Sequence, residues 1–125
     1  MILGLGIDII EIERIKHSVD KFKDHFLNKI YTQSELEYCL SKKNKYQHLA
    51  ARFTAKEAVF KALSSGVQSK TGWKDIEIVN GHHGQPVVYL KGKIEKLIPS
   101  DQIIIISISH SRDFAACIAI LSNRS

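Results

Sequence analysis

Charged side chains that could carry chemistry are concentrated between Ala50 and Leu63, a stretch of strong helix formers that predicts a long helix. At a period of 3.6 residues, Lys56 falls within the apolar stripe of this helix, Glu57 lies at its edge, and Lys61 follows one turn later. Two interpretations are open. In one, Glu57 and Lys61 form an ordinary surface pair while Lys56 extends its ammonium to water. In the other, Glu57 is a metal ligand and the lysines bind phosphate.

A second carboxylate stands in an otherwise apolar run. Residues 2 to 10 consist almost entirely of isoleucine, leucine and glycine, which predicts a strand buried on both faces. Asp8 interrupts this run, and a buried carboxylate is costly unless it is paired, hydrogen-bonded or bound to a metal. Because a helical pattern begins nearby, Asp8 could also cap that helix. The sequence leaves both roles open.

The charge distribution points to an anionic ligand. The net charge is +5, and residues 41 to 61 contain six basic side chains and a single acid, Glu57. This excess suits a phosphate group, although nucleic acid, an acidic protein and a phosphorylated cofactor are all compatible with the net charge. No nucleic-acid-binding motif and no aromatic stacking platform accompany it, so we expect no nucleic-acid partner.

Histidines occur in two predicted turns. His110 lies in Ser109–Asp113, where serine, histidine and aspartate are close neighbours, but five consecutive residues rarely form a hydrolase triad. His110 is therefore either a hydrogen-bond donor to a ligand at a strand end or an ordinary turn residue. His82 and His83 have no third metal ligand nearby and are expected to be polar loop residues.

The length predicts one domain spanning residues 1–125. The pattern of helices mostly in the first half and strands mostly in the second predicts an α+β domain, in which an antiparallel sheet packs against the long helix. Hydrophobic residues make up 44% and charged residues 25%, which is ordinary for a globular chain. Cys39 and Cys117 lie in apolar periodic sequence and are expected to be buried free thiols. Without a basic leader or a run long enough to span a membrane, the chain is expected to be cytoplasmic and to make no membrane contact.

Periodicity and turn signals predict the individual elements. Helices are expected from residue 11 into the twenties, from Thr32 with a Thr32–Glu35 capping box and Leu36, Cys39 and Leu40 facing inward, over 50–63, and over 94–97. Strands are expected over 2–10, over 76–79 and 86–90 as a hairpin, and over 103–108 and 114–121 as central strands. The first helix also has a basic face formed by Arg14, Ser18 and Lys21. This face is either solvated or a docking surface for an acidic helical partner.

Three motifs occur in order along the chain: Gly6-Ile7-Asp8-Ile9-x-Glu11-Ile12-x-Arg14-Ile15, Arg52-Phe53-x-x-Lys56-Glu57-Ala58-x-x-Lys61-Ala62, and Ser107-Ile108-Ser109-His110. Together they resemble the holo-[acyl-carrier-protein] synthase family, the small bacterial type of 4′-phosphopantetheinyl transferase, and the resemblance runs nearly end to end. Where the family commonly has Gly-Thr-Gly after the helix, this chain has Ser64-Ser65-Gly66.

The resemblance implies transfer of the phosphopantetheine arm of coenzyme A to a serine of apo acyl carrier protein, with release of adenosine 3′,5′-bisphosphate, in support of fatty acid biosynthesis. It also implies dependence on Mg²⁺ or Mn²⁺ and a homotrimer with active sites at subunit interfaces. Asp8 and Glu57 would hold the metal, with Glu57 as general base, and Lys61 would neutralise the diphosphate.

The resemblance implies further ligand contacts. Arg52 and His110, with the basic loop around Lys43 and Lys45, would bind the 3′-phosphate and adenosine. The remaining cofactor and partner contacts would be Gly66, Gly84 and Pro86 beside the nucleotide, and Arg14, Ser18 and Lys21 toward acyl carrier protein. Two rival functions are a small nucleic-acid-binding module, which the basic composition suggests, and a metal-dependent phosphohydrolase. The second is a rival because two carboxylates and lysines would activate water as well as serine.

Overall fold

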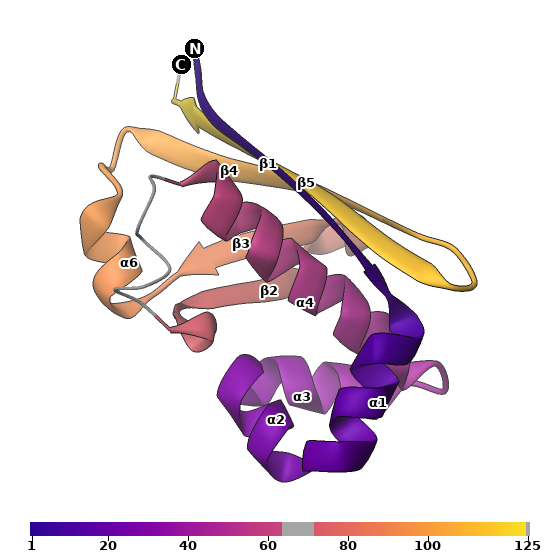
Figure 1. The fold of residues 1–125 in the computed structure, drawn as a ribbon. Coiled ribbons are helices and arrows are strands. Elements are labelled where there is room, and N and C mark those ends of the chain that lie inside the picture. The colour runs from indigo at the N-terminus through magenta and orange to yellow at the C-terminus, as the bar shows by residue number, and fades with distance from the viewer. Residues whose placement is uncertain (64–71, 125) are drawn as a thin grey trace.

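The N-terminal half of the chain is mostly helical and the C-terminal half is mostly strands, which confirms the predicted α+β class (Figure 1). The computed structural model describes residues 1–63 and 72–124. Its helices are α1 (Ile12–Phe22), α2 (Asp24–Ile30), α3 (Gln33–Leu40), α4 (Lys45–Ala62) and α6 (Gly92–Leu97). Its strands are β1 (Ile2–Glu11), β2 (Ile76–Asn80), β3 (Pro86–Leu90), β4 (Gln102–His110) and β5 (Phe114–Asn123), and the 3₁₀ turns η1 and η2 cover Trp73–Asp75 and His82–Gly84.

The strands form two antiparallel sheets. Strands β1, β5 and β4 make a three-stranded sheet in that order, and β2 and β3 pair as the predicted hairpin. Of the two strands predicted to be central, only β5 is, because β4 lies at an edge of its sheet. The two ends of the chain lie side by side (Figure 1), and the amide of Asn123 donates to the carbonyl of Met1 over 3.1 Å.

Helix α4 lies across the inner face of the three-stranded sheet, and α1 to α3 gather around its N-terminal half (Figure 1). Two glycines allow β1 to approach this helix closely. A Cβ atom at Gly4 would lie 1.9 Å from the carbonyl oxygen of Ala62, and one at Gly6 would lie 2.0 Å from that of Ala58. The Gly4-x-Gly6 pattern therefore serves backbone packing, and it holds the following Asp8 against α4.

The apolar core surrounds α4 in two clusters. One cluster joins the C-terminal half of the helix to both sheets, and the other joins its N-terminal half to α1, α2 and α3. The fully buried side chains of these clusters include Val59, Ile76 and Ile78 in the first and Tyr31, Cys39 and Leu49 in the second. Each large apolar side chain buried in this way contributes about 1.5 to 3 kcal/mol to stability, so α4 is held in place from both ends.

Local predictions in the first half of the chain are largely confirmed. Thr32 is the N-cap of α3, and it forms the predicted capping box with Glu35. Cys39 and Cys117 are buried free thiols. The pattern expected to be one helix into the twenties is instead two helices, because Lys23 takes a left-handed φ of 49° between α1 and α2. None of the described helices has the length and apolar character needed to cross a membrane.

Two predictions about burial are wrong. The sequence predicts that β1 is buried on both faces, but Leu5, Ile7 and Ile9 are 61, 66 and 64% exposed. These side chains alternate with residues that face α4, and in the described chain nothing covers the outer face of the sheet. Leu40, expected to face inward, is 44% exposed because it occupies the last position of α3.

Candidate active site

Asp8 is held between two side chains of α4. The hydroxyl of Thr54 donates to Oδ2 of Asp8 over 2.6 Å, and Lys61 Nζ lies 3.1 Å from Oδ1. Lys61 Nζ also donates to the carbonyl of Ile7 over 3.0 Å. The alternative role of Asp8 as a helix cap is wrong, because β1 continues past it and Glu11 occupies the N-cap position of α1. The carboxylate is thus oriented by the long helix.

This carboxylate is accessible from two sides. Asp8 and Glu57 both line a groove of about 680 Å³, which continues along α1 past Arg14 and Ser18. On its other side Asp8 lines a hollow of about 300 Å³ together with Lys61. The side chain of Asp8 is 17% exposed and that of Lys61 is 52% exposed. The predicted catalytic residues therefore lie around Asp8, with Glu57 in the groove on one side and Lys61 in the hollow on the other.

The donor atoms here suit a hard divalent cation. Mg²⁺ prefers oxygen ligands, keeps several waters, and commonly uses one or two protein carboxylates beside substrate phosphate. Asp8 and Glu57 supply two carboxylates to one groove, and Asp8 keeps spare acceptor capacity because a carboxylate has about four lone-pair sites. Within residues 1–63 and 72–124, no group of three or more metal-ligating side chains forms a closed cage. The two carboxylates at this groove are a ligand set that Mg²⁺ could complete with water and phosphate oxygens.

Arg52 projects from the opposite side of α4. It precedes Lys61 by nine residues, which is about two and a half helical turns. Arg52 is only 4% exposed, its Nη2 donates to Oδ1 of Asn80 over 3.4 Å, and its guanidinium carbon lies 4.4 Å from the ring centre of Tyr38. The structure therefore separates Arg52 from Asp8 within one chain.

The other predicted nucleotide contacts lie apart from Asp8 or outside the described residues. Pro86 pairs with Asn80 across the β2–β3 hairpin, and Gly84 lies in the loop between them with a φ of 81°. His110 is exposed at the end of β4. Burial, followed by the nearby charges of Arg52, Lys42 and His110, lowers the pKa of His48. Gly66 lies outside the described residues.

The predicted docking face is only partly joined to this groove. Arg14 and Ser18 line it together with Asp8 and Glu57. Lys21 is exposed in the last turn of α1, and its ammonium lies 5.3 Å from the ring centre of Phe22.

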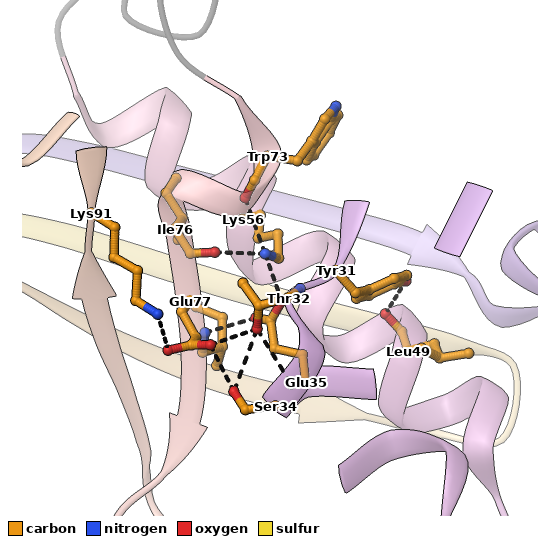
Figure 2. A network of polar contacts seen from close by, with 11 residues as sticks. Tyr31, Thr32, Ser34, Glu35, Leu49, Lys56, Trp73, Ile76, Glu77 and Lys91 are labelled. Carbon is orange, nitrogen blue, oxygen red and sulfur yellow. Dashed lines mark hydrogen bonds and ion pairs between the residues drawn. The ribbon is translucent and has the colours of Figure 1, made fainter. Parts of the chain in front are cut away.

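Lys56, the residue before Glu57, is sealed inside the protein. Its ammonium lies 2.8 Å from Oε1 of Glu35 and donates to the carbonyls of Trp73 and Ile76 over 3.0 and 2.5 Å. Figure 2 shows these contacts as dashed lines. Both charged side chains are 0% exposed. Burial lowers the pKa of Lys56, and the charge of Glu35 opposes that shift. Lys56 thus neither reaches water nor lies where it could bind phosphate, and both interpretations of it are wrong.

The same network continues to the surface through Glu77 (Figure 2). Glu35 accepts from the amide of Thr32 over 2.9 Å and from an amide of β2 over 2.8 Å. Glu77 accepts from the hydroxyls of Thr32 and Ser34 over 2.5 and 2.6 Å and pairs with Lys91 over 2.7 Å. Burial by itself would raise the pKa of Glu77, but these donors outweigh it and lower the value to about 2. The network joins α3 to the hairpin.

Sequence reasoning missed several residues of these sites. Thr54 was not predicted, although it precedes Lys61 by seven residues, about two helical turns, and so shares its face of α4. Glu35 was recognised only as a capping residue, and Tyr38 and Asn80 had no signal that linked them to Arg52. These partners lie far apart in the chain, so spacing alone could not reveal them.

Comparisons with known proteins assign the chain to a family. Residues 4–119 match the sequence profile of the ACPS family, described as the 4′-phosphopantetheinyl transferase superfamily. The chain belongs to this superfamily. A holo-[acyl-carrier-protein] synthase of Protochlamydia amoebophila is 44% identical over 123 residues, which cover 98% of this chain and 100% of that protein. The predicted family and enzyme class are confirmed.

Two solved structures of the superfamily resemble this fold along nearly their whole length. A holo-(acyl-carrier-protein) synthase from Bacillus anthracis, in complex with CoA (3′,5′-ADP), has a TM-score of 0.80 and 35% identity, and covers 100% of this chain and 99% of that one. A holo-[acyl-carrier-protein] synthase from Helicobacter pylori, in complex with coenzyme A, has a TM-score of 0.82 and 32% identity, and the match covers 94% of this chain and 99% of that one.

Proposed function

We propose that this protein, acting as one domain over residues 1–125, transfers the 4′-phosphopantetheine part of coenzyme A to a serine of apo acyl carrier protein. The observation that carries the proposal is the position of Asp8. Its carboxylate is fixed between Thr54 and Lys61 and faces the same groove as Glu57. The relatives are named for this reaction, and two of them were solved with coenzyme A or its nucleotide.

In this reaction the serine oxygen bonds to the phosphorus that bears pantetheine, and the bond from that phosphorus to the bridging oxygen breaks. Adenosine 3′,5′-bisphosphate leaves, and Glu57 accepts the hydroxyl proton. Lys61 uses two of its three N–H donors on Asp8 and Ile7, so the third is available to the diphosphate. Mg²⁺ or Mn²⁺, held by Asp8 and Glu57, would neutralise charge that develops on the phosphoryl oxygens.

Two features support assembly into a homotrimer with shared active sites. The outer face of the three-stranded sheet carries exposed apolar side chains on all three strands, including Leu5, Ile105 and Ile118, and such a contiguous patch favours association. In addition, Arg52 and Lys61 point to opposite sides of α4, so a neighbouring subunit would supply Arg52 to the 3′-phosphate of a coenzyme A whose diphosphate lies beside Lys61. Light scattering should give the mass of three chains.

The groove beside Asp8 also supports acyl carrier protein as the partner. Because the groove beside Asp8 runs past Arg14 and Ser18, a carrier protein docked on α1, with Lys21 at its far end, would hold its serine near Glu57. Acyl carrier protein would place the reaction in fatty acid biosynthesis. The two buried free thiols fit the reducing cytoplasm.

A transfer assay tests the proposal. The protein is incubated with apo acyl carrier protein, coenzyme A and Mg²⁺, and intact mass should show addition of one phosphopantetheine to the carrier. Mg²⁺ omitted in the presence of a chelator should abolish the addition. If phosphopantetheine is released equally well without any carrier protein, the enzyme is a hydrolase and the proposal is wrong.

A further inference from the structure

Tyr38 is the centre of a cluster on the side of α4 that faces away from Asp8. The ring centre of Tyr38 lies 4.4 Å from the guanidinium carbon of Arg52 and 4.5 Å from the ammonium of Lys42. The imidazole of His48 meets the ring edge to face, with centres 5.5 Å apart. The Tyr38 hydroxyl accepts a hydrogen bond from Nδ2 of Asn80 over 2.7 Å. One aromatic side chain thus contacts three basic residues and the end of β2.

Arg52 lacks the counterion that its burial calls for. It is 4% exposed, and its Nε has no hydrogen-bond partner. Among the residues that the structure describes, the ion pairs are formed by lysines, and none includes Arg52. A buried guanidinium without a carboxylate is costly, and the ammonium of Lys42 on the same tyrosine ring adds to the positive potential. An anion bound here would offset that cost.

A guanidinium is suited to this anion because its planar N–H groups match the oxygens of a phosphate in pairs. Its weak bond to Asn80, at 3.4 Å, leaves most of those donors available. Stacking on an aromatic ring restricts the plane of the guanidinium without using any of its N–H groups. Tyr38 can therefore orient Arg52 and leave its donors free for a ligand.

We propose that Tyr38 is a positioning residue that aligns Arg52 and Lys42 into a site for a phosphate monoester, which, if the proposed function holds, is the 3′-phosphate of coenzyme A. Tyr38 does this through its ring, which faces both cations, and through its hydroxyl, which anchors the Asn80 amide beside Arg52. The consequence is selectivity for the 3′-phosphate rather than affinity for the whole cofactor.

Calorimetry with coenzyme A and dephospho-coenzyme A measures this selectivity as the ratio of the two dissociation constants. Tyr38→Leu removes the ring and should lower the ratio about tenfold, since two cation–ring contacts are lost. Tyr38→Phe keeps the ring and should lower it only about threefold. Phe22→Leu is the matched control, because the Phe22 ring also faces a lysine, Lys21, which is not among the proposed cofactor contacts. Its ratio should equal that of the parent.

A purely structural role for Tyr38 predicts a different result. In that case Tyr38→Leu weakens the binding of coenzyme A and of dephospho-coenzyme A by the same factor. The ratio of their dissociation constants is then unchanged, and the proposal is overturned. It is likewise overturned if Phe22→Leu lowers the ratio as much as Tyr38→Leu.

Inorganic phosphate tests the cluster without coenzyme A. The melting temperature of the parent should rise with phosphate concentration, and that rise should be lost in Tyr38→Leu. If the transfer assay fails but this difference is observed, the proposed function is wrong and the phosphate site stands. If transfer succeeds but the parent shows neither the rise nor a preference for the 3′-phosphate, the Tyr38 proposal alone is wrong.

Discussion

Two lysines of α4 pair with carboxylates from other elements, and the surroundings of the two pairs differ completely. Lys56 and Glu35 are 0% exposed, and further donors and acceptors from α3, η1 and β2 surround the pair (Figure 2). Lys61 and Asp8 are partly exposed, line open hollows and retain unused donors and acceptors. The Lys56–Glu35 pair therefore joins structural elements together, whereas the Lys61–Asp8 pair is available to a ligand.

The difference lies in solvent access and in spare hydrogen-bonding capacity. A buried pair is tolerated only when its remaining donors and acceptors are satisfied, and it then has nothing left to offer a substrate. A half-exposed pair contributes little to stability, but its spare lone pairs and N–H groups can bind a metal or phosphate. We therefore expect substitutions in the first pair to change stability and substitutions in the second to change catalysis.

The largest effect should come from the two carboxylates that line the groove, Asp8 and Glu57. Asp8→Asn and Glu57→Gln should each lower kcat on the order of a thousandfold, about 4 kcal/mol of transition-state stabilisation, because each removes a charged ligand for the metal. Activity is measured over a Mg²⁺ titration, with the melting temperature as the control for folding. Near-normal turnover of either variant at limiting Mg²⁺ would show that its carboxylate is not a metal ligand.

The sealed pair should respond in stability instead. Glu35→Gln leaves the ammonium of Lys56 buried without a charge partner, and it should lower the free energy of unfolding by about 3 to 4 kcal/mol. Urea denaturation measures this loss. Glu37→Gln, on the exposed side of the same helix, is the matched control and should change little. If Glu35→Gln unfolds at the same urea concentration as the parent, the Lys56–Glu35 pair does not stabilise the fold.

An intermediate effect is expected at Thr54, a buried residue whose hydroxyl donates a hydrogen bond to Asp8 of the open pair. Thr54→Val keeps the shape and removes the hydrogen bond that orients Asp8, so Mn²⁺ affinity should fall about tenfold. Electron paramagnetic resonance of free Mn²⁺ measures that affinity without turnover. Thr54→Ser, which retains the hydroxyl, should restore it. Equal Mn²⁺ affinity in the Val and Ser variants would mean that the hydroxyl does not position Asp8.

The outer part of the sealed network allows a pH test. The pKa of Glu77 is lowered to about 2 from an ordinary value of 4.5, so its stabilisation is fully present above pH 4.5 and is lost as the pH falls toward 2. After allowance for the exposed Lys91, the contribution is about 1 to 2 kcal/mol. Chemical denaturation from pH 5 to pH 2 should show a smaller loss for Glu77→Gln than for the parent. If the parent and Glu77→Gln lose the same free energy of unfolding between pH 5 and pH 2, the ionised Glu77 does not contribute this stabilisation.

The smallest effect should lie at the far end of the open groove. Reversal of Arg14 and Lys21 to Glu should raise KM for carrier protein several-fold and flatten its salt dependence, because exposed charges act mainly on encounter. The KM for coenzyme A is the internal control and should not change. Parent-like kinetics at low ionic strength would indicate that this basic face is only solvated.

The sequence by itself determined the features that depend on near neighbours. The helical period of 50–63, the capping box of Thr32 and the hairpin around residues 80–86 arise from interactions within a few residues, and all three are present in the structure. The four-residue interval between Glu57 and Lys61 also places these two side chains on neighbouring positions of one helix face.

Only the tertiary structure decided what each charge does. Thr54 and Asp8 are 46 residues apart in the chain, and Lys56 meets a carboxylate that its own helix does not carry. A helical pattern shows that Lys56 points inward but not whether its partner is water, phosphate or Glu35. The outer face of β1 is exposed for the same kind of reason: burial depends on which element packs against a surface, and that is set by contacts between distant parts of the chain.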